Sequence, residues 1–322
     1  MLDTEFTRLV GCTTPIQSVP VPGIATAEFV AAVCNAGGLG MLSGGLASPD
    51  TLRADLDRLE ANTSGPFGVN FLMPFVTVDM SLIEMAASRA RVVEFFYGEP
   101  DRELVTMARA GGALCSWQVG SVAEAQAAEQ AGCDFIIIQG VEAGGHVRGS
   151  AGLLPVLSGT LAAVTVPVLA AGGLATGRDV AAMLSAGAAG CRVGTRFVCT
   201  RESNAHEDYK QALVAANAAD TVHTETFSVM WPDAPHRVLQ SAVDAMQTCV
   251  EEVIGECNIS GKVWSIARGS IIAPTRESVG NIQAMALYAG QSVANIHSVD
   301  SVAEVMHELV DEATRHLSAM PR

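Results

Sequence analysis

The sequence predicts an α/β fold, a (β/α)₈ (TIM) barrel with a smaller, mainly helical second domain or insertion. From about residue 15 to 200, apolar runs of four to six residues alternate with alanine-rich helical stretches. The runs are apolar on both faces, as strands buried in a parallel sheet are. An open doubly wound sheet is the alternative, but it expects a Gly-x-Gly-x-x-Gly turn after the first strand, and no such turn is present.

The expected strands are short apolar runs that end at turn residues. They span Pro15–Val19, Leu39–Ser43, Gly68–Phe71, Val92–Phe96, Ala113–Trp117, Phe135–Gln139, Val168–Ala171 and Cys191–Gly194. The expected helices lie near residues 25–36, 49–60, 79–89, 101–110, 121–131, 152–163 and 177–186. Ser48 and Pro49 suit the N-cap and first position of one helix, and Ser121 with Glu124 predicts a capping box at another.

The alternation of strands and helices stops near residue 213, which indicates a second unit. We expect a barrel of residues 1–212, completed by C-terminal helices within 285–322, and a mainly helical substrate-capping domain of residues 213–284. Within these units, apolar residues at helical spacing predict helices over Ala242–Ile254, 281–289 and 302–317.

Composition narrows the range of functions. The 322 residues are 49% hydrophobic and carry a formal net charge of −15 with no basic block, which argues against nucleic acid or an anionic membrane as a partner. We see no signal peptide and no apolar stretch near the ~20 residues of a membrane span, so we expect a cytoplasmic protein with a small-molecule substrate. The eight cysteines contain no Cys-x-x-Cys pair and are interpreted as reduced, buried thiols, with no metal site. The oligomeric state is open, with a homodimer as one option.

Two glycine-rich turns follow the seventh and eighth expected strands. Gly172 and Gly173 end one strand, and Gly194 and Thr195 end the next. Barrels of this kind place a phosphate site in these two loops, where backbone N–H groups point at the anion. Ordinary tight turns are the alternative, but the presence of both turns in this order favours a phosphate site.

Polar residues also follow earlier strands, at the end of the barrel where active sites form. Asn70 ends the third strand and would present its amide to a polar ring edge or cap a helix. Gln118 ends the fifth strand and either meets a cofactor ring or lies on the surface. His146 follows the glycines after the sixth strand and is the candidate acid/base. Glu142, in the same turn, is expected to hydrogen-bond backbone.

These segments together resemble the nitronate monooxygenase (2-nitropropane dioxygenase-like) family of FMN-dependent (β/α)₈ barrels, over nearly the whole chain. The segments that carry the resemblance are Asn35–Gly40, Pro66–Asn70, Gln139–His146, Ala170–Gly173, Gly194–Phe197 and Ala289–Gln291. The resemblance implies that Asn70, Gln118 and Gln139 approach the flavin, that Gly172, Gly173, Gly194 and Thr195 hold its phosphate, and that His146 is the active-site acid/base. It also implies cofactor contacts from Gly144, Gly145, Gly290 and Gln291.

The sequence departs from this family after the first strand, where Ser18 and Val21 stand in place of the usual glutamine and methionine, so the wall beside the flavin differs. Arg201–His206 with Tyr209-Lys210 is similar to the flavin-dependent enoyl-[acyl-carrier-protein] reductases, and Ala234–Leu239 to relatives that act on acyl-CoA intermediates. The leading hypothesis is oxidation of an alkyl nitronate by O₂, giving a carbonyl compound and nitrite. The alternatives are an NAD(P)H-dependent FMN reductase of enoyl thioesters or quinones, and a non-catalytic flavin-binding protein.

Overall fold

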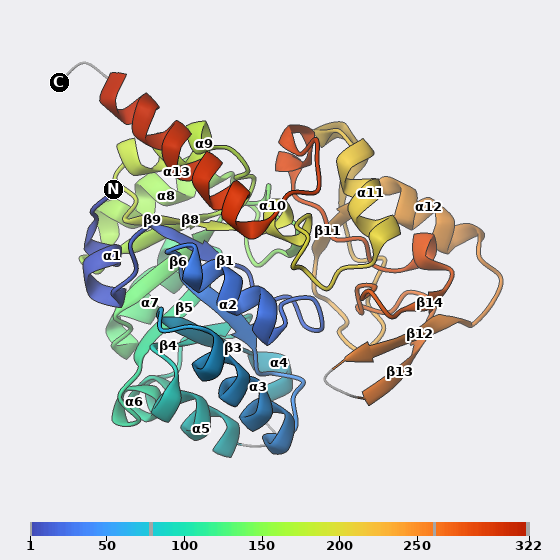
Figure 1. Cartoon of the computed structure of the whole chain (residues 1–322), viewed down its shortest axis with the longest axis horizontal. Coiled ribbons are helices and arrows are strands. Elements are labelled where there is room, and N and C mark those ends of the chain that lie inside the picture. Colours follow the sequence, from blue (N-terminus) through green and yellow to red (C-terminus); the bar gives the residue numbers. More distant parts are fainter. Residues whose placement is uncertain (1, 77–79, 260–261, 320–322) are drawn as a thin grey trace.

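The computed structural model describes residues 2–76, 80–259 and 262–319, and in them eight parallel strands form one barrel (Figure 1). The order of neighbours is β1 (Ile16–Ser18), β9 (Gly190–Val193), β8 (Val168–Ala171), β6 (Phe135–Gln139), β5 (Leu114–Val119), β4 (Val92–Phe96), β3 (Phe67–Leu72) and β2 (Gly40–Ser43). The barrel closes between β1 and Leu39, whose backbone exchanges hydrogen bonds of 3.0 Å with Ser18 and 2.9 Å with Ile16. The predicted (β/α)₈ fold is confirmed.

Helices surround the barrel where the sequence predicts them. They are α2 (Ala27–Asn35), α3 (Pro49–Asn62), α5 (Ser81–Arg89), α6 (Arg102–Ala110), α7 (Val122–Ala131), α8 (Leu153–Ala163) and α9 (Gly177–Ser185). The C-terminal helix α13 (Val302–Ala319), drawn in red in Figure 1, packs across α9 and α2 and confirms the helix expected over 302–317. The remaining α-helices described outside residues 213–284 are α1 (Glu5–Val10), α4 (Met73–Val76), α10 (Thr195–Val198) and α11 (Glu207–Ala215).

The two predicted helix starts differ in detail. Ser48 caps α3 by accepting the N–H of Thr51 at 3.2 Å, with Pro49 in the first turn, as expected. Ser121 likewise caps α7 by accepting the N–H of Glu124. The capping box is not formed, however, because the Glu124 carboxylate accepts the N–H of Gly120, one residue before the N-cap, at 2.8 Å.

The interior of the barrel is apolar at one end and polar at the other. Helix α1 closes the apolar end, where Phe6 packs edge-on against Phe135 with ring centroids 5.4 Å apart. At the other end the buried residues are polar, namely Gln17, Asn70, Glu94, Gln118 and Arg192. Because parallel strands all end on the same side, this polar end is the side from which the loops rise and where a site is expected.

Residues 213–284 are not mainly helical, which corrects the prediction. They hold α12 (Gln240–Thr248), two strands β10 (Thr221–Thr224) and β11 (His236–Leu239), and the strands β12 (Val253–Ile259), β13 (Lys262–Ala267) and β14 (Val279–Gly280). The helical prediction failed because the apolar residues here follow the near-alternating pattern of a half-buried strand. In β12, Ile254, Cys257 and Ile259 are buried in the core of the lobe, whereas Val253 is exposed. Val263 of β13 is exposed as well. This lobe lies to the right of the barrel in Figure 1.

The helix predicted over 281–289 is also wrong. The chain there forms a 3₁₀ turn, η2 (Ile282–Ala284), and then runs extended so that Tyr288 bridges Val238 of β11. A further 3₁₀ helix, η3 (Gln291–Asn295), leads back towards α13. Backbone pairing with β11 thus takes precedence over the apolar spacing of this segment.

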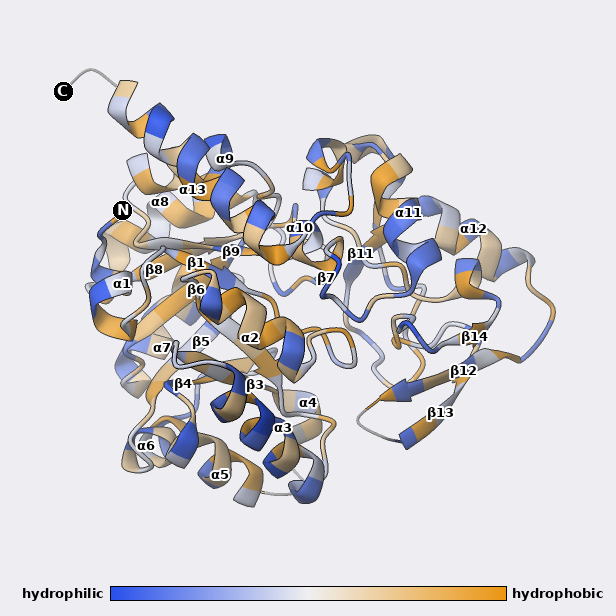
Figure 2. Ribbon diagram, viewed as in Figure 1, coloured by the Kyte–Doolittle hydropathy of each residue, from blue (hydrophilic) through white to orange (hydrophobic). Residues whose placement is uncertain are grey.

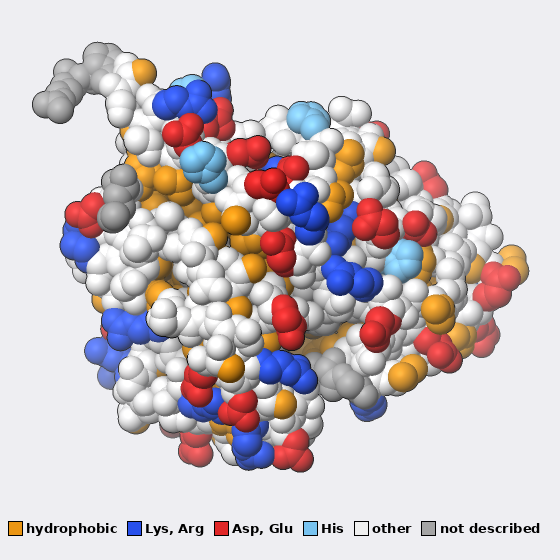
Figure 3. All heavy atoms as spheres, in the orientation of Figure 1, with side chains coloured by type: hydrophobic (Ala, Val, Ile, Leu, Met, Phe, Trp, Pro, Cys, Tyr) orange, Lys and Arg blue, Asp and Glu red, His pale blue; other side chains and the backbone are white. Residues whose placement is uncertain are grey.

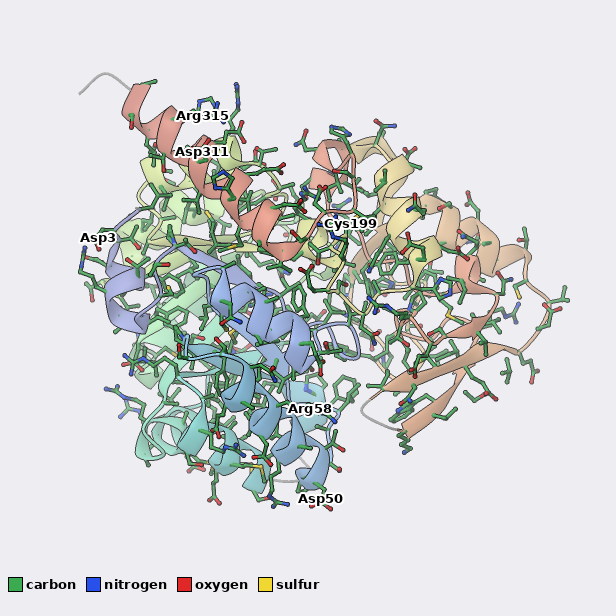
Figure 4. All side chains as sticks on the ribbon, in the orientation of Figure 1. Asp3, Asp50, Arg58, Cys199, Asp311 and Arg315 are labelled. Atoms are coloured by element: carbon green, nitrogen blue, oxygen red, sulfur yellow. The ribbon has the colours of Figure 1, made fainter. Side chains whose placement is uncertain are left out.

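Apolar side chains fill the junction of barrel and lobe, and orange ribbon continues from one to the other in Figure 2. Cys199, which is labelled near this junction in Figure 4, is one of eight cysteines that are all free and buried, as the sequence predicts. Acidic and basic side chains are interspersed over the face drawn in Figure 3. Within the described residues, no helix is long and apolar enough to cross a membrane.

Candidate active site

One open cavity of about 1000 Å³, including solvent space at its mouth, lies at the polar end of the barrel. It collects most of the residues that the sequence singles out, namely Asn70, Gln118, Gln139, Gly144, Gly145, His146, Gly172, Gly173, Gly194 and Thr195. Gly290 and Gln291 stand behind its wall: their N–H groups donate to Thr195 Oγ1 and to the Glu142 carbonyl, each at 3.0 Å. Ser292, which the sequence analysis did not single out, lines the cavity beside them.

The two glycine turns face this cavity from neighbouring strands β8 and β9. Gly172 and Gly173 have φ angles of 111° and 69°, in the region that only glycine adopts freely. A Cβ on Gly172 would also lie 3.0 Å from the Gly140 carbonyl oxygen. Thr195 Oγ1 accepts from Gly290, which leaves its own hydroxyl proton to donate into the cavity. The arrangement suits an anion held by backbone amides and one hydroxyl.

A hydrogen-bonded cluster of buried side chains forms the cavity floor. Glu94 accepts from Arg192 Nη2 at 2.7 Å and Asn70 Nδ2 at 2.8 Å through one oxygen, and from Gln17 Nε2 at 3.0 Å through the other. Arg192 Nη1 donates to the Gln118 side-chain oxygen. The alternatives of Asn70 as a helix cap and Gln118 as a surface residue are therefore wrong.

Three buried atoms of this floor lack a hydrogen-bond partner within the described residues, and one of them, Gln17 Oε1, belongs to a residue that does not line the cavity. The other two are Asn70 Oδ1 and Arg192 Nε. A buried polar group without a partner costs about 1–3 kcal/mol, so such groups indicate that a ligand completes them. One is an acceptor and the other a donor, and both side chains line the cavity.

Gln139 fixes the loop that carries His146. Its Nε2 donates to the His146 carbonyl at 3.0 Å, and its Oε1 accepts the N–H of Arg148 at 3.1 Å. Both ends of the amide are thus engaged with backbone, so its contact with a flavin stays a prediction. Glu142 accepts the N–H of Leu153 through both carboxylate oxygens, which confirms the backbone role expected for it.

His146 stands at the mouth of the cavity as part of β7 (Gly145–His146), which pairs with β11. Its ring stacks on Trp231, with centroids 4.0 Å apart and planes 19° apart. Nε2 is buried and has no partner among the described residues. Burial, with a smaller contribution from nearby His236, lowers the pKa of His146 to about 3. The imidazole is therefore neutral near pH 7, with one nitrogen able to face a ligand.

The loops around His146 are conformationally strained. Tyr97, Met230 and Asp233 have φ angles of 66°, 81° and 55°. Residues other than glycine seldom take such angles, and they cluster where the surrounding structure holds a functional site. The Tyr97 ring centroid lies 4.6 Å from that of Trp231 and 6.0 Å from that of His146, so Tyr97 belongs to the enclosure around the histidine. No local sequence signal predicts this enclosure, because Tyr97, His146 and Trp231 lie far apart along the chain.

A second, apolar pocket of about 480 Å³ continues from the cavity. The two share the lining residues Val21, Pro22, Leu72, His146, Trp231 and Tyr288. Barrel loops and the second lobe both contribute its walls, which are Val21, Pro22, Leu46, Leu72, Phe75, Met230, Ile259, Ile271, Ile272 and Ala273. No charged side chain of the described residues lines it. Val21, one of the two departures noted in the sequence, lines both pockets. Ser18 lines neither and accepts the N–H of Met41 at 3.1 Å.

The lowered pKa of His146 predicts how stability depends on pH. The unfolded chain titrates this histidine near its ordinary pKa of ~6.5, whereas the folded value is about 3. Between these values the unfolded state binds more protons, so the free energy of unfolding falls as the pH drops below ~6.5. In urea unfolding between about pH 5 and pH 8, the free energy of unfolding should fall more steeply with decreasing pH for the parent protein than for His146→Gln. Equal slopes would contradict the neutral, buried state.

Comparisons with known proteins agree with this architecture. The chain matches the nitronate monooxygenase family over residues 3–81 and 76–312. The nitronate monooxygenase of Pseudomonas aeruginosa is 32% identical over 275 residues, which cover 70% of this chain and 77% of that protein. A Mycobacterium tuberculosis 5-hydroxy-7a-methyl-1-oxo-octahydro-1H-indene-4-carboxyl-CoA dehydrogenase is 34% identical over 242 residues, covering 74% of this chain and 67% of that one.

Solved structures of related oxidoreductases superpose on almost the full length of this chain. FabK from Thermotoga maritima superposes with a TM-score of 0.80 at 26% identity, covering 99% of this chain and 98% of its own. Nitroalkane oxidase from Streptomyces ansochromogenes superposes with a TM-score of 0.76 at 28% identity, covering 98% of this chain and 99% of its own. Fold, cavity and relatives define an oxidoreductase built on a (β/α)₈ barrel, which removes the non-catalytic alternative. The chain belongs to the nitronate monooxygenase family.

Proposed function

We propose that this protein is an FMN-dependent nitronate monooxygenase that converts an alkyl nitronate and O₂ to a carbonyl compound and nitrite. The observation that carries the proposal is His146, a neutral imidazole that lines both the polar cavity and the apolar pocket and whose Nε2 has no partner among the described residues. When bound at this site, FMN would supply the redox chemistry that links the substrate to O₂. The family membership supports a flavin, and the site supports FMN in particular.

The residues present fit FMN. The turns at Gly172–Gly173 and Gly194–Thr195 offer backbone and one hydroxyl to a phosphate. The unpartnered acceptor of Asn70 and donor of Arg192 suit the polar edge of a flavin ring, where carbonyl and N–H groups alternate. A cavity of this size and mixed lining is typical of a cofactor site.

His146 would act on the substrate through Nε2. As a neutral imidazole it accepts the α-proton of a nitroalkane, or donates a hydrogen bond to a nitronate oxygen in its other tautomer. Trp231 stacked on the ring holds its orientation and keeps water from one face. The apolar pocket would hold the alkyl part of the substrate, since no charged side chain among its described walls could bind a second anionic group.

Anaerobic mixing of the purified yellow protein with a nitronate tests the proposal. We expect hexane-1-nitronate to bleach the flavin, with nitrite released in air, and propionate-3-nitronate to react more slowly because its carboxylate finds only apolar walls. NADH and NADPH in parallel should bleach the flavin slowly or not at all. A flavin that ignores both nitronates but is bleached by a nicotinamide would reject this function.

The second candidate is an NAD(P)H-dependent FMN reductase of an enoyl thioester. It is favoured by the apolar pocket, which suits an acyl chain, and by the indene-carboxyl-CoA dehydrogenase and FabK among the similar proteins. Reduction of an enoyl group needs a proton donor, and the low pKa of His146 opposes that role. Lys210, in the segment similar to enoyl reductases, donates to the Ser203 carbonyl at 2.8 Å and does not line the cavity.

A further inference from the structure

Two opposite charges are buried inside the barrel, and the function proposed above assigns neither a part in the reaction. Glu94 lies in the middle of β4 and Arg192 in β9, 98 residues later in the chain. Their side chains are 0% and 3% exposed, and the guanidinium meets the carboxylate at 2.7 Å. Taking two charges out of water carries a desolvation cost that a buried pair does not always offset, so stability alone explains it poorly.

Among the described residues, every side-chain nitrogen and oxygen of the pair except one has a hydrogen-bond partner. Both oxygens of Glu94 accept hydrogen bonds, from Gln17 on one side and from Asn70 and Arg192 on the other. Arg192 uses Nη1 for Gln118 and Nη2 for Glu94. Of the three guanidinium nitrogens, only Nε has no partner among the described residues; this atom is buried, and the Arg192 side chain lines the cavity. The guanidinium is thus held in place by Glu94 and Gln118 at the cavity floor.

We propose that Arg192 is a positioning residue that hydrogen-bonds the polar edge of the flavin ring and stabilises the negative charge of the reduced cofactor, with Glu94 as its fixed counter-charge. This inference rests on the proposed FMN site. When the ring takes two electrons and one proton from the substrate side, it gains one negative charge. A guanidinium held against the ring favours that charge, and a hydrogen bond to a charged group is stronger than a neutral one.

If the pair acts on the flavin, substitutions of its two members should shift the reduction potential of the bound flavin in opposite directions. Arg192→Gln removes the positive charge and leaves Glu94 beside the ring, so reduction of the bound flavin becomes less favourable. Glu94→Gln keeps an oxygen for Arg192 but removes the negative charge, so reduction becomes more favourable. A structural defect would instead shift the reduction potential of the bound flavin in the same direction in both variants.

The experiment measures FMN binding to the apoprotein, the two-electron midpoint potential, and the affinity for sulfite, an anion that reports the same preference for negative charge at the ring. For Arg192→Gln we expect at least about a tenfold weaker sulfite affinity, the effect of losing one charged hydrogen bond, and a midpoint potential lower by ~30 mV or more, which corresponds to tenfold for two electrons. Glu94→Gln should shift both in the opposite sense, and Arg192→Lys should stay near the parent.

Arg196→Gln is the matched control, because Arg196 is also buried and ion-paired, with Asp300 at 2.7 Å, but does not line the cavity. Its potential and sulfite affinity should equal those of the parent. A yellow Arg192→Gln protein with parental values, or Glu94→Gln and Arg192→Gln shifts of the same sign, would overturn the inference while leaving the proposed function intact. A parent protein that refuses FMN would instead overturn the proposed function.

Discussion

Replacing His146 by glutamine should lower kcat/KM for a neutral nitroalkane, whose α-proton must be removed, by about 10²–10⁴-fold, the usual contribution of a positioned acid/base group. The fall follows from geometry: His146 lines both the cavity and the apolar pocket, and its Nε2 has no partner among the described residues. Glutamine keeps a polar side chain but cannot accept a proton. FMN content should remain parental, because the phosphate turns and the cavity floor lie on other strands.

His223→Gln is the control for this variant. His223 lies exposed on β10 and does not line the cavity, so its replacement should leave the rate unchanged. Steady-state nitrite release and single-turnover flavin reduction should be measured for both. A His146→Gln protein that reduces its flavin at the parental rate would show that the histidine only shapes the pocket.

The barrel could be predicted because each of its strands is buried on both faces. Such strands are nearly continuous apolar runs, as in Phe135–Gln139, and the local signal needs no knowledge of what packs around it. The second lobe gave a weaker signal. Residues 281–289 have apolar residues at helical spacing, yet the bridge of Tyr288 to Val238 holds them extended, and that pairing depends on a partner some fifty residues away.

The candidate site was predicted in part for the same reason. Residues at strand ends, such as Asn70 and His146, could be found because their position follows from the barrel. The Glu94–Arg192 pair was missed, although a signal existed: each charge interrupts an apolar strand, in Val-Val-Glu-Phe-Phe and in Cys-Arg-Val. Charged residues are almost never fully buried unless paired, so one acid and one base inside strands of the same barrel predict each other. Trp231 carried no comparable signal.

Glu94→Ala should be the most destabilising single change in the barrel interior, by about 3–5 kcal/mol, because it removes one partner of a buried ion pair. Arg192 would keep its charge without a counter-charge, and the amides of Gln17 and Asn70 would lose their acceptor. A domain is usually stable by only about 5–15 kcal/mol, so the variant should unfold at a much lower urea concentration. Equilibrium urea unfolding of the FMN-free protein measures this without any contribution from the cofactor.

The double variant Glu94→Ala/Arg192→Met separates the loss of the pair from the exposure of one charge. If the cost comes from an uncompensated guanidinium, removing that charge as well should restore much of the stability, since apolar replacement of a buried pair is often nearly neutral. A double variant less stable than Glu94→Ala would mean that packing and the amide network, rather than charge, hold this end of the barrel. Recovery of stability with a lowered flavin potential would place the pair's purpose in the redox chemistry, because the fold would then be shown not to need it.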